Sequence, residues 1–170
     1  MGRFDTTPEA TADVGQPTPT LSEGPYFKPG SPEESSLVEN GSGAQRLLIA
    51  GRVLTTGGQA ISGAKLDFWQ ADENGVYDNG GCRYRGHQFS QQDGTYRLET
   101  VLPRVYTGRT RHIHVKVSAN GMRELTTQLY FPGEPGNAGD RIFNERLLLT
   151  NLQQSGNTLE GSFDFVLAPG

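Results

Sequence analysis

The sequence predicts an all-β protein, namely an antiparallel β-sandwich of about seven or eight strands with long loops and little helix. Glycine contributes 23 of the 170 residues and proline 10, a composition typical of short strands joined by turns. Apolar residues make up 34% of the chain and recur in short alternating runs, whereas long runs with helical spacing are missing. Clusters of Gly, Asp and Asn separate these runs and predict turns.

Alternating apolar and polar side chains place the individual strands. They are expected at residues 46–54, 65–70, 96–101, 112–118, 125–131 and 161–167. Residues 78–86 are rich in glycine and are expected to be irregular, and residues 132–140 form a Pro/Gly loop. Residues 141–149 are the one place where a short helix is expected.

The length fits a single domain with a real core. Residues 1–20 are rich in Thr, Pro, Gly, Asp and Glu and are expected to be a flexible N-terminal tail, with the β-sandwich domain over residues 21–170. The tail lacks the apolar segment of a signal peptide, so a cytoplasmic protein is expected, although removal of a leader would leave the same N-terminus. The net charge of −4 argues against nucleic acid or an anionic membrane as a partner. Cys82 is the single cysteine, which excludes an intrachain disulfide and a cysteine metal site.

The strand expected at residues 112–118 carries two of the three histidines of the chain. His112 and His114 lie on the same side of this strand, about 6.5–7 Å apart along it, so both imidazoles can converge on one metal ion. Tyr106 precedes them across a glycine-containing turn and is close enough in sequence to fold back toward the same point. These three side chains are therefore candidate metal ligands, although a His-x-His pair on a strand is often only a pair of surface or hydrogen-bonded histidines.

The residue types indicate which metal such a site would bind. Neutral imidazole suits zinc, copper, nickel and iron. A tyrosine must lose its proton from a pKa of about 10 to become a ligand, which a strongly charged hard cation favours, so a trivalent ion is indicated. A ferrous site with two histidines and one carboxylate is also open, because an acidic residue could come from elsewhere. Spacing alone does not choose a second tyrosine from the candidates Tyr77, Tyr84, Tyr96 and Tyr130.

A series of motifs then matches a known family in order along the chain. The motifs are EGPY at 23–26, GAKLDFWQADENGVY at 63–77, YRGHQ at 84–88, DGTY at 93–96, TVLP at 100–103, YTGRTRHIH at 106–114 and TQLYF at 127–131. Together they resemble the intradiol ring-cleavage dioxygenases, which comprise the catechol 1,2-, hydroxyquinol 1,2- and protocatechuate 3,4-dioxygenases, here in a short single-domain form. The resemblance covers residues 21–167.

The resemblance implies a β-sandwich around one mononuclear, non-haem Fe(III) ion. By position in the motifs, the ligands would be Tyr77, Tyr106, His112 and His114. Tyr106 matches the tyrosine that leaves the iron when substrate binds, and so it is also a catalytic residue.

The same motifs imply residues that contact the substrate. Arg109 matches a catalytic arginine that binds the substrate and stabilises the anionic ring as it develops. Gln128 matches a polar residue that lines the pocket. Pro25 and Tyr26 match the segment that walls the substrate site, whereas spacing alone favours Tyr26 and Phe27 as a plug at the edge of the sandwich.

The activity implied is cleavage of a catechol-type substrate between its two hydroxylated carbons with O2, to give a cis,cis-muconate-type diacid. No nucleic acid or membrane partner is expected, and the oligomeric state is open between a monomer and a small homo-oligomer. A transthyretin-like, non-catalytic β-sandwich binding module is the main alternative, because the segments Gly51–Leu66 and Asp93–Tyr96 also resemble that class. A zinc hydrolase with the same ligands is a third reading.

Overall fold

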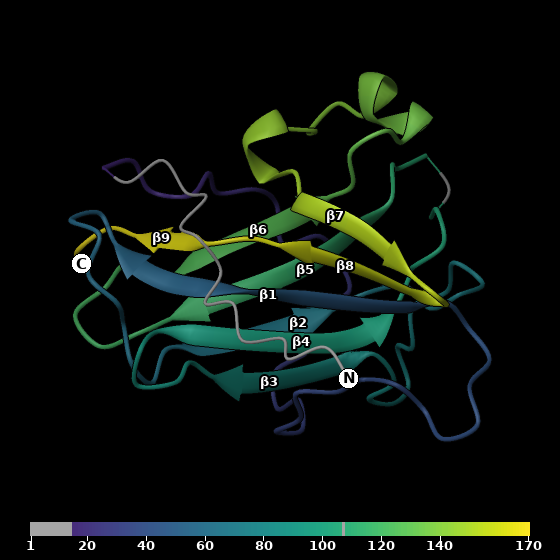
Figure 1. Ribbon diagram of the computed structural model, residues 1–170, viewed down its shortest axis with the longest axis horizontal. Helices are drawn as coiled ribbons and strands as arrows, with labels where there is room; N and C mark the ends of the chain where they lie inside the picture. The colour runs from purple at the N-terminus through teal and green to yellow at the C-terminus, as the bar shows by residue number, and fades with distance from the viewer. Residues whose placement is uncertain (1–14, 107) are drawn as a thin grey trace.

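The computed structural model describes residues 15–106 and 108–170 and contains two packed β-sheets (Figure 1). One sheet has the order β4-β1-β8-β7, with β9 also paired to β1; its strands are β1 (Arg46–Thr55), β4 (Thr95–Val101), β7 (Thr150–Ser155), β8 (Thr158–Ser162) and β9 (Phe165–Leu167). The other has the order β3-β2-β5-β6; its strands are β2 (Lys65–Trp69), β3 (Arg85–Phe89), β5 (His112–Ser118) and β6 (Leu125–Tyr130). The predicted all-β fold class is confirmed.

The core lies between the two sheets and follows from the alternation of the strands. In β1, Leu47 and Ile49 are fully buried and alternate with partly exposed neighbours. In β5, Ile113, Val115 and Val117 are fully buried on the face that packs against the first sheet. These two strands therefore contribute every second side chain to the core, which leaves the other set on the opposite face.

The strand count and one pairing differ from the sequence prediction. The described residues form nine strands rather than about seven or eight, and β1 pairs in parallel with β8 and β9 whereas the other ladders are antiparallel. The expected closing strand at 161–167 is two strands, because residues 163 and 164 interrupt it. Strands β3 and β7 were not predicted, since neither has a regular apolar alternation.

The predicted helix at residues 141–149 is wrong in type. This region holds only the 3₁₀ turn η2 (Glu145–Leu147), and a second 3₁₀ turn, η1 (Pro135–Gly139), lies in the loop before it. Within the described residues there is no α-helix, and none long and apolar enough to cross a membrane. Two prolines and three glycines lie just before this region, at residues 132–139, and they prevent a helix from extending back into the loop.

The predicted N-terminal tail is only partly within the described residues, because residues 1–14 lie outside them. Thr18 is buried, and its backbone N–H donates to the carbonyl of Val166 on β9. Residues 32–37 continue along the sheet edges, forming bridges at Glu33 to β3 and at Ser36 to β4. The N-terminal segment is therefore part of the packed structure from at least Thr18 onward.

Replacing Gly51 with alanine should destabilise the sandwich. A Cβ at Gly51 would lie 1.8 Å from the carbonyl oxygen of Phe163, a backbone atom that cannot move aside without shifting the chain. We expect Gly51→Ala to lower the free energy of unfolding by about 1–3 kcal/mol, measured by urea denaturation. Gly43→Ala is the control, because no described atom lies within 4 Å of its added Cβ. Equal stability of the two variants would contradict this packing argument.

Candidate active site

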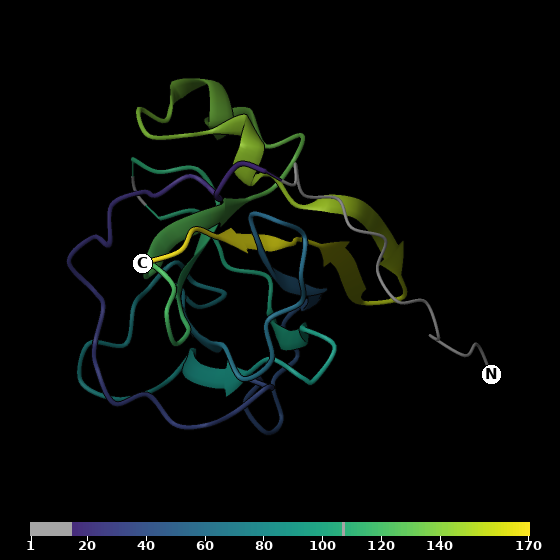
Figure 2. The same cartoon turned by 90° about the vertical axis from the view of Figure 1, so that its left-hand side faces the viewer.

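The predicted site residues gather on the outer face of the four-stranded sheet. Trp69 on β2 is paired with His114 on β5, which is paired in turn with Gln128 on β6, so these three side chains form one row across the sheet. His112 is paired with Tyr130 in the next row. In Figure 2 the purple N-terminal segment runs along this outer side of the sheet and covers it. The site is therefore built on three adjacent strands and closed by loops.

Three of the four predicted metal ligands meet at one point. The Tyr77 hydroxyl lies 3.2 Å from Nε2 of His112 and 3.1 Å from Nε2 of His114, and the two Nε2 atoms are 3.1 Å apart. All three side chains are buried, with exposed fractions between 4% and 7%. Tyr77 comes from the loop after β2, so a residue 35 positions from His112 joins the pair that β5 supplies.

The protons available do not satisfy this triangle of atoms. His112 donates its Nδ1–H to the carbonyl of Thr110 at 2.7 Å, so in the neutral ring Nε2 is a bare acceptor. The Tyr77 hydroxyl and His114 supply at most two protons for three contacts, which leaves one contact between two lone pairs. Donor atoms 3.1–3.2 Å apart are spaced to lie about 2.0–2.2 Å from one common cation. The donor set therefore fits a single metal ion.

Tyr106, the fourth predicted ligand, is close to the triangle but is bonded elsewhere. Its hydroxyl lies 2.6 Å from the hydroxyl of Tyr26, and its ring stands edge-on to Tyr77 with centroids 5.6 Å apart. A tight turn holds it, in which Arg109 donates its backbone N–H to the Tyr106 carbonyl and Gly108 has a φ of 80° that favours glycine. The turn brings Tyr106 and Arg109 to the same side of the site.

Residues 22–31, called here the covering segment, include Pro25 and Tyr26 and lie over the three converging side chains. The Tyr26 ring stacks on Tyr77 at 4.5 Å, and Phe27 packs on Trp69 at 4.9 Å. Pro25 is exposed at the bend before them. The expectation from spacing, a plug at the sandwich edge, is wrong for Tyr26, because its ring lies against the candidate ligands.

A second row of outer side chains anchors this covering segment. The Ser31 hydroxyl donates to Asp67 at 2.8 Å and lies 3.1 Å from Nδ1 of His87. Lys116 places its ammonium 4.5 Å from the centre of the Phe27 ring. Asp67, His87 and Lys116 are cross-strand neighbours one row away from His114. His87 is thus a contact of the covering segment.

Arg109 is fixed from two sides. Its Nε donates to Asp140 at 2.8 Å, and its Nη2 donates to Oε1 of Gln128 at 2.7 Å and to the Tyr130 hydroxyl at 3.2 Å. Gln128 in turn donates to the carbonyl of Ser22, which joins it to the covering segment. No acceptor among the described residues engages Nη1 of Arg109, so its two N–H groups are free for an anionic ligand.

Burial keeps the candidate ligands neutral when no cation is near. It raises the pKa of Tyr77, an effect that Arg109 partly opposes. It lowers the pKa of His112 to about 4, although the hydrogen bond to Thr110 works the other way. It also lowers the pKa of His114, to which His112 and Arg109 add. A bound cation would reverse the effect on Tyr77, because opposite charge favours the phenolate.

Some residues of the site were not found from the sequence. Trp69 stacks on His114 with ring centroids 4.9 Å apart, and the side chain of Asp140 is 1% exposed against Arg109. Burial opposes the charge of Asp140, but hydrogen bonds from Thr110 and Arg109 outweigh it and hold its pKa below the usual range. Trp69 could be found from strand register, whereas Asp140 lies in a loop whose sequence gives no signal.

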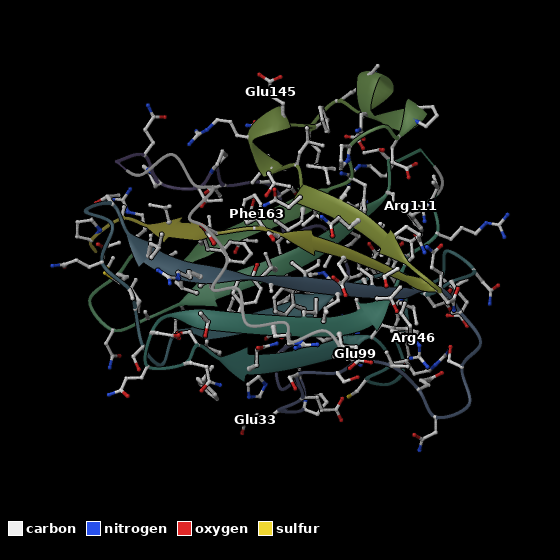
Figure 3. The ribbon with its side chains drawn as sticks, in the orientation of Figure 1. Glu33, Arg46, Glu99, Arg111, Glu145 and Phe163 are labelled. Carbon is white, nitrogen blue, oxygen red and sulfur yellow. The ribbon has the colours of Figure 1, made fainter. Side chains whose placement is uncertain are left out.

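Other parts of the described chain offer no competing metal site. Residues 15–106 and 108–170 contain no group of three or more His, Cys, Asp or Glu side chains placed to hold a metal ion. A cavity of about 480 Å³ lies elsewhere, between the N-terminal segment and η2, with Phe163 and Glu145 on its walls (Figure 3). None of the predicted site residues lines it. A metal site anywhere in the described residues would therefore need tyrosine ligands beside the histidines.

The fold and the cluster of tyrosines and histidines indicate a class of protein, and comparison with known families shows which class it is. Residues 22–169 match the family model described as Dioxygenase, and the chain belongs to the intradiol ring-cleavage dioxygenase family. The chain is 28% identical over 176 residues to the 6-chlorohydroxyquinol 1,2-dioxygenase of Cupriavidus pinatubonensis. That match covers 86% of this chain but 63% of the relative, so the chain spans about three-fifths of that enzyme.

Solved structures give the same family. The dioxygenase domain of a dioxygenase carbohydrate-binding protein fusion from the cellulolytic bacterium Streptomyces sp. SirexAA-E is 50% identical, with a TM-score of 0.87, and the match covers 91% of this chain and all of that one. The 3-chlorocatechol 1,2-dioxygenase of Rhodococcus opacus 1CP is 27% identical, with a TM-score of 0.83, over 94% of this chain and 76% of that one. The described residues thus form the fold of these enzymes.

The stability of the metal-free protein should depend on pH through His112. Its pKa is about 4 when folded against 6.5 ordinarily, so between these values the unfolded chain binds a proton that the folded protein does not. The contribution of His112 to the unfolding free energy is therefore nearly constant above pH 6.5 and falls below it, by about 2 kcal/mol at pH 5, and His114, whose pKa is also lowered by burial, adds a loss in the same direction. Urea denaturation at pH 7 and 5 measures the loss, and His112→Asn should reduce it. An equal loss in that variant would contradict the assignment.

Proposed function

We propose that this chain is a mononuclear, non-haem Fe(III)-dependent intradiol dioxygenase. It cleaves the ring of a catechol-type substrate between the two hydroxylated carbons and incorporates both atoms of O2, giving a cis,cis-muconate-type diacid. The observation that carries the proposal is the convergence of Tyr77, His112 and His114 within 3.1–3.2 Å of one another, with Tyr106 and Arg109 beside them. Membership of the intradiol family supports it, and the names of the relatives include catechol and hydroxyquinol 1,2-dioxygenases.

In this proposal Tyr77, His112, His114 and Tyr106 hold the iron. When bound, the ferric ion would supply Lewis acidity and a template that orients the two catechol oxygens and withdraws electron density from the ring. Two phenolates and two neutral imidazoles suit a trivalent ion better than zinc, whose structural sites prefer Cys and His. This donor set speaks against the zinc hydrolase, and the family match speaks against a non-catalytic binding module.

Tyr106 is the residue proposed to accept a proton from the substrate. It is half-buried, whereas Tyr77 is buried, and its hydroxyl already has a partner in Tyr26 at 2.6 Å. A tyrosine with a second hydrogen-bonding partner can give up the metal without leaving its hydroxyl unsatisfied. Tyr77 lies under the stacked ring of Tyr26, so it is the ligand that stays.

Arg109 and the covering segment act on the substrate ring. The free Nη1 donors of Arg109 would stabilise negative charge that develops on the ring, in a site where burial strengthens the interaction. Pro25 and Tyr26 form the wall above it, and Gln128 orients Arg109 from below. The proposed substrates are catechols as a class. The proposed location is the cytoplasm, and the protein is proposed to be either a monomer or a small homo-oligomer, as expected from the sequence.

The visible absorption spectrum of the purified protein tests the metal and its tyrosine ligands together. We expect one equivalent of iron and a broad phenolate-to-iron charge-transfer band that shifts when catechol is added without oxygen. Tyr77→Phe should weaken this band, whereas Tyr84→Phe, which removes a buried hydroxyl bonded to Glu73, should leave it intact. A protein that stays colourless after ferric reconstitution would remove the tyrosine ligands and the dioxygenase proposal with them.

Substitution of the departing tyrosine separates iron binding from turnover. Tyr106→Phe should keep iron, because three ligands remain, but should lose the proton acceptor and with it about 10²–10⁴-fold in kcat. Metal analysis and oxygen uptake with catechol measure the two effects. Turnover at the wild-type rate in iron-loaded Tyr106→Phe would show that another group takes the proton.

A further inference from the structure

The buried carboxylate of Asp140 accepts three hydrogen bonds beside the candidate site. One oxygen accepts from Nε of Arg109 at 2.8 Å and from the backbone N–H of Thr110 at 2.9 Å, and the other accepts from the backbone N–H of Ile142 at 3.1 Å. Its side chain is 1% exposed, so solvent does not compete for these contacts. Asp140 follows η1 in the loop after β6, far in sequence from Arg109.

The contact geometry restricts how Arg109 can lie. Asp140 holds its Nε, while Gln128 and the Tyr130 hydroxyl hold its Nη2. Two nitrogens held by directional hydrogen bonds, together with the Cδ to which Nε is bonded, fix the plane of a guanidinium group, so the position of the remaining nitrogen is set as well. That remaining nitrogen, Nη1, is the one whose donors are free for an anionic ligand.

The same carboxylate also reaches the start of β5. Thr110 donates its backbone N–H to this carboxylate, and its carbonyl oxygen accepts a hydrogen bond from Nδ1–H of His112 at 2.7 Å. The Thr110 hydroxyl donates to Oδ1 of Asn137 at 2.6 Å, so the loop after β6 accepts two hydrogen bonds from Thr110. The carboxylate of Asp140 thus holds both Arg109 and the Thr110 backbone that orients His112.

We infer that Asp140 is a positioning residue that fixes the guanidinium of Arg109 so that its Nη1 donors face the substrate. The inference rests on the proposed function, since it concerns how Arg109 acts on the ring. Asp140 touches neither the substrate position nor the candidate ligands directly, and it acts through Arg109.

Asp140→Asn is the first test, because it keeps the shape of the side chain but removes the charge and one of the two acceptor oxygens. In the iron-loaded full-length protein we expect kcat with catechol to fall about 10- to 100-fold, as a misplaced catalytic group does, with a smaller change in KM. Iron content and the dissociation constant for catechol, measured without oxygen, should change less than kcat does. A kcat within twofold of wild type would overturn the inference.

Glu134→Gln is the matched control. Glu134 lies in the same loop and forms a similar ion pair with Arg111 at 2.9 Å, but the hydrogen bonds of the Arg111 side chain within the described residues go to Glu134 and the Pro103 carbonyl, and none goes to a candidate ligand. This variant should keep the wild-type kcat. A loss equal to that of Asp140→Asn would mean that any disturbance of the loop has the same effect, which would overturn the assignment to Arg109.

A double variant distinguishes positioning from general support of the fold. If Asp140 acts through Arg109, adding Asp140→Asn to Arg109→Ala should lower kcat no further, within about twofold. An additional loss of the same size as in the single variant would overturn the inference. Asp140→Glu provides a second test at the same position: it keeps the charge but moves the carboxylate by one methylene, so it should also lose kcat, and a kcat within twofold of wild type would overturn the inference.

These outcomes separate the inference from the proposed function. Wild-type protein that is inactive with catechols would overturn both. Active wild-type protein with an equally active Asp140→Asn variant would overturn only the role of Asp140. Thermal unfolding of each variant shows whether it is folded, and Asp140→Glu keeps the inference testable if Asp140→Asn does not fold.

Discussion

The register of β5 is the constraint on which both the sandwich and the site depend. Its inward side chains Ile113, Val115 and Val117 have no exposed surface, and its outward side chains include His112 and His114. A slip of one residue would exchange the two sets, placing imidazoles in the core and apolar side chains at the site. The burial that stabilises the sandwich therefore also fixes the two histidines. Pairing with β2 and β6 then decides that Trp69 and Gln128 are their neighbours.

The strands supply rigid groups, and the loops supply the rest of the chemistry. Tyr77 and Arg109 lie in loops, yet the side chain of each is attached to the sheet, Tyr77 at the histidines of β5 and Arg109 at Gln128 of β6. Tyr106 also lies in a loop and packs against Tyr77 and Tyr26. The covering segment is held in the same way, since Ser31 bonds to the outer row of the sheet and Gln128 holds Ser22. Loop residues are thereby placed with a precision that loops by themselves do not have.

The sequence predicted best those features that depend on local alternation. The strand at 112–118 has the bounds of β5, and the convergence of His112 and His114 follows from a two-residue spacing. Strand β3 was not predicted, because residues Arg85 to Phe89 mix charged, small and aromatic side chains on both of its faces. In addition, Gly86 packs against Leu37 at a position where an apolar side chain would be expected. Tyr77 could be selected from the other tyrosines only by resemblance to a family. Asp140 could not be selected at all, because its role arises from a contact 31 residues away in sequence.

The electrostatics of the site give a reason for its architecture. Burial opposes charge on Tyr77, His112 and His114, so without a cation they remain neutral and three contacts share at most two protons. Asp140 is ionised beside Arg109, and this pair adds little net charge to the site. A trivalent ion would therefore bind to candidate ligands that are neutral beforehand, and a tyrosine would become negatively charged only as the ion binds and its proton is lost. The protein avoids a preformed cluster of buried anions, whose mutual repulsion and desolvation would destabilise the fold. In the proposed function, a catechol would bring two acidic hydroxyls and would replace a tyrosinate ligand, because both are phenolic oxygens that lose a proton for the same reason.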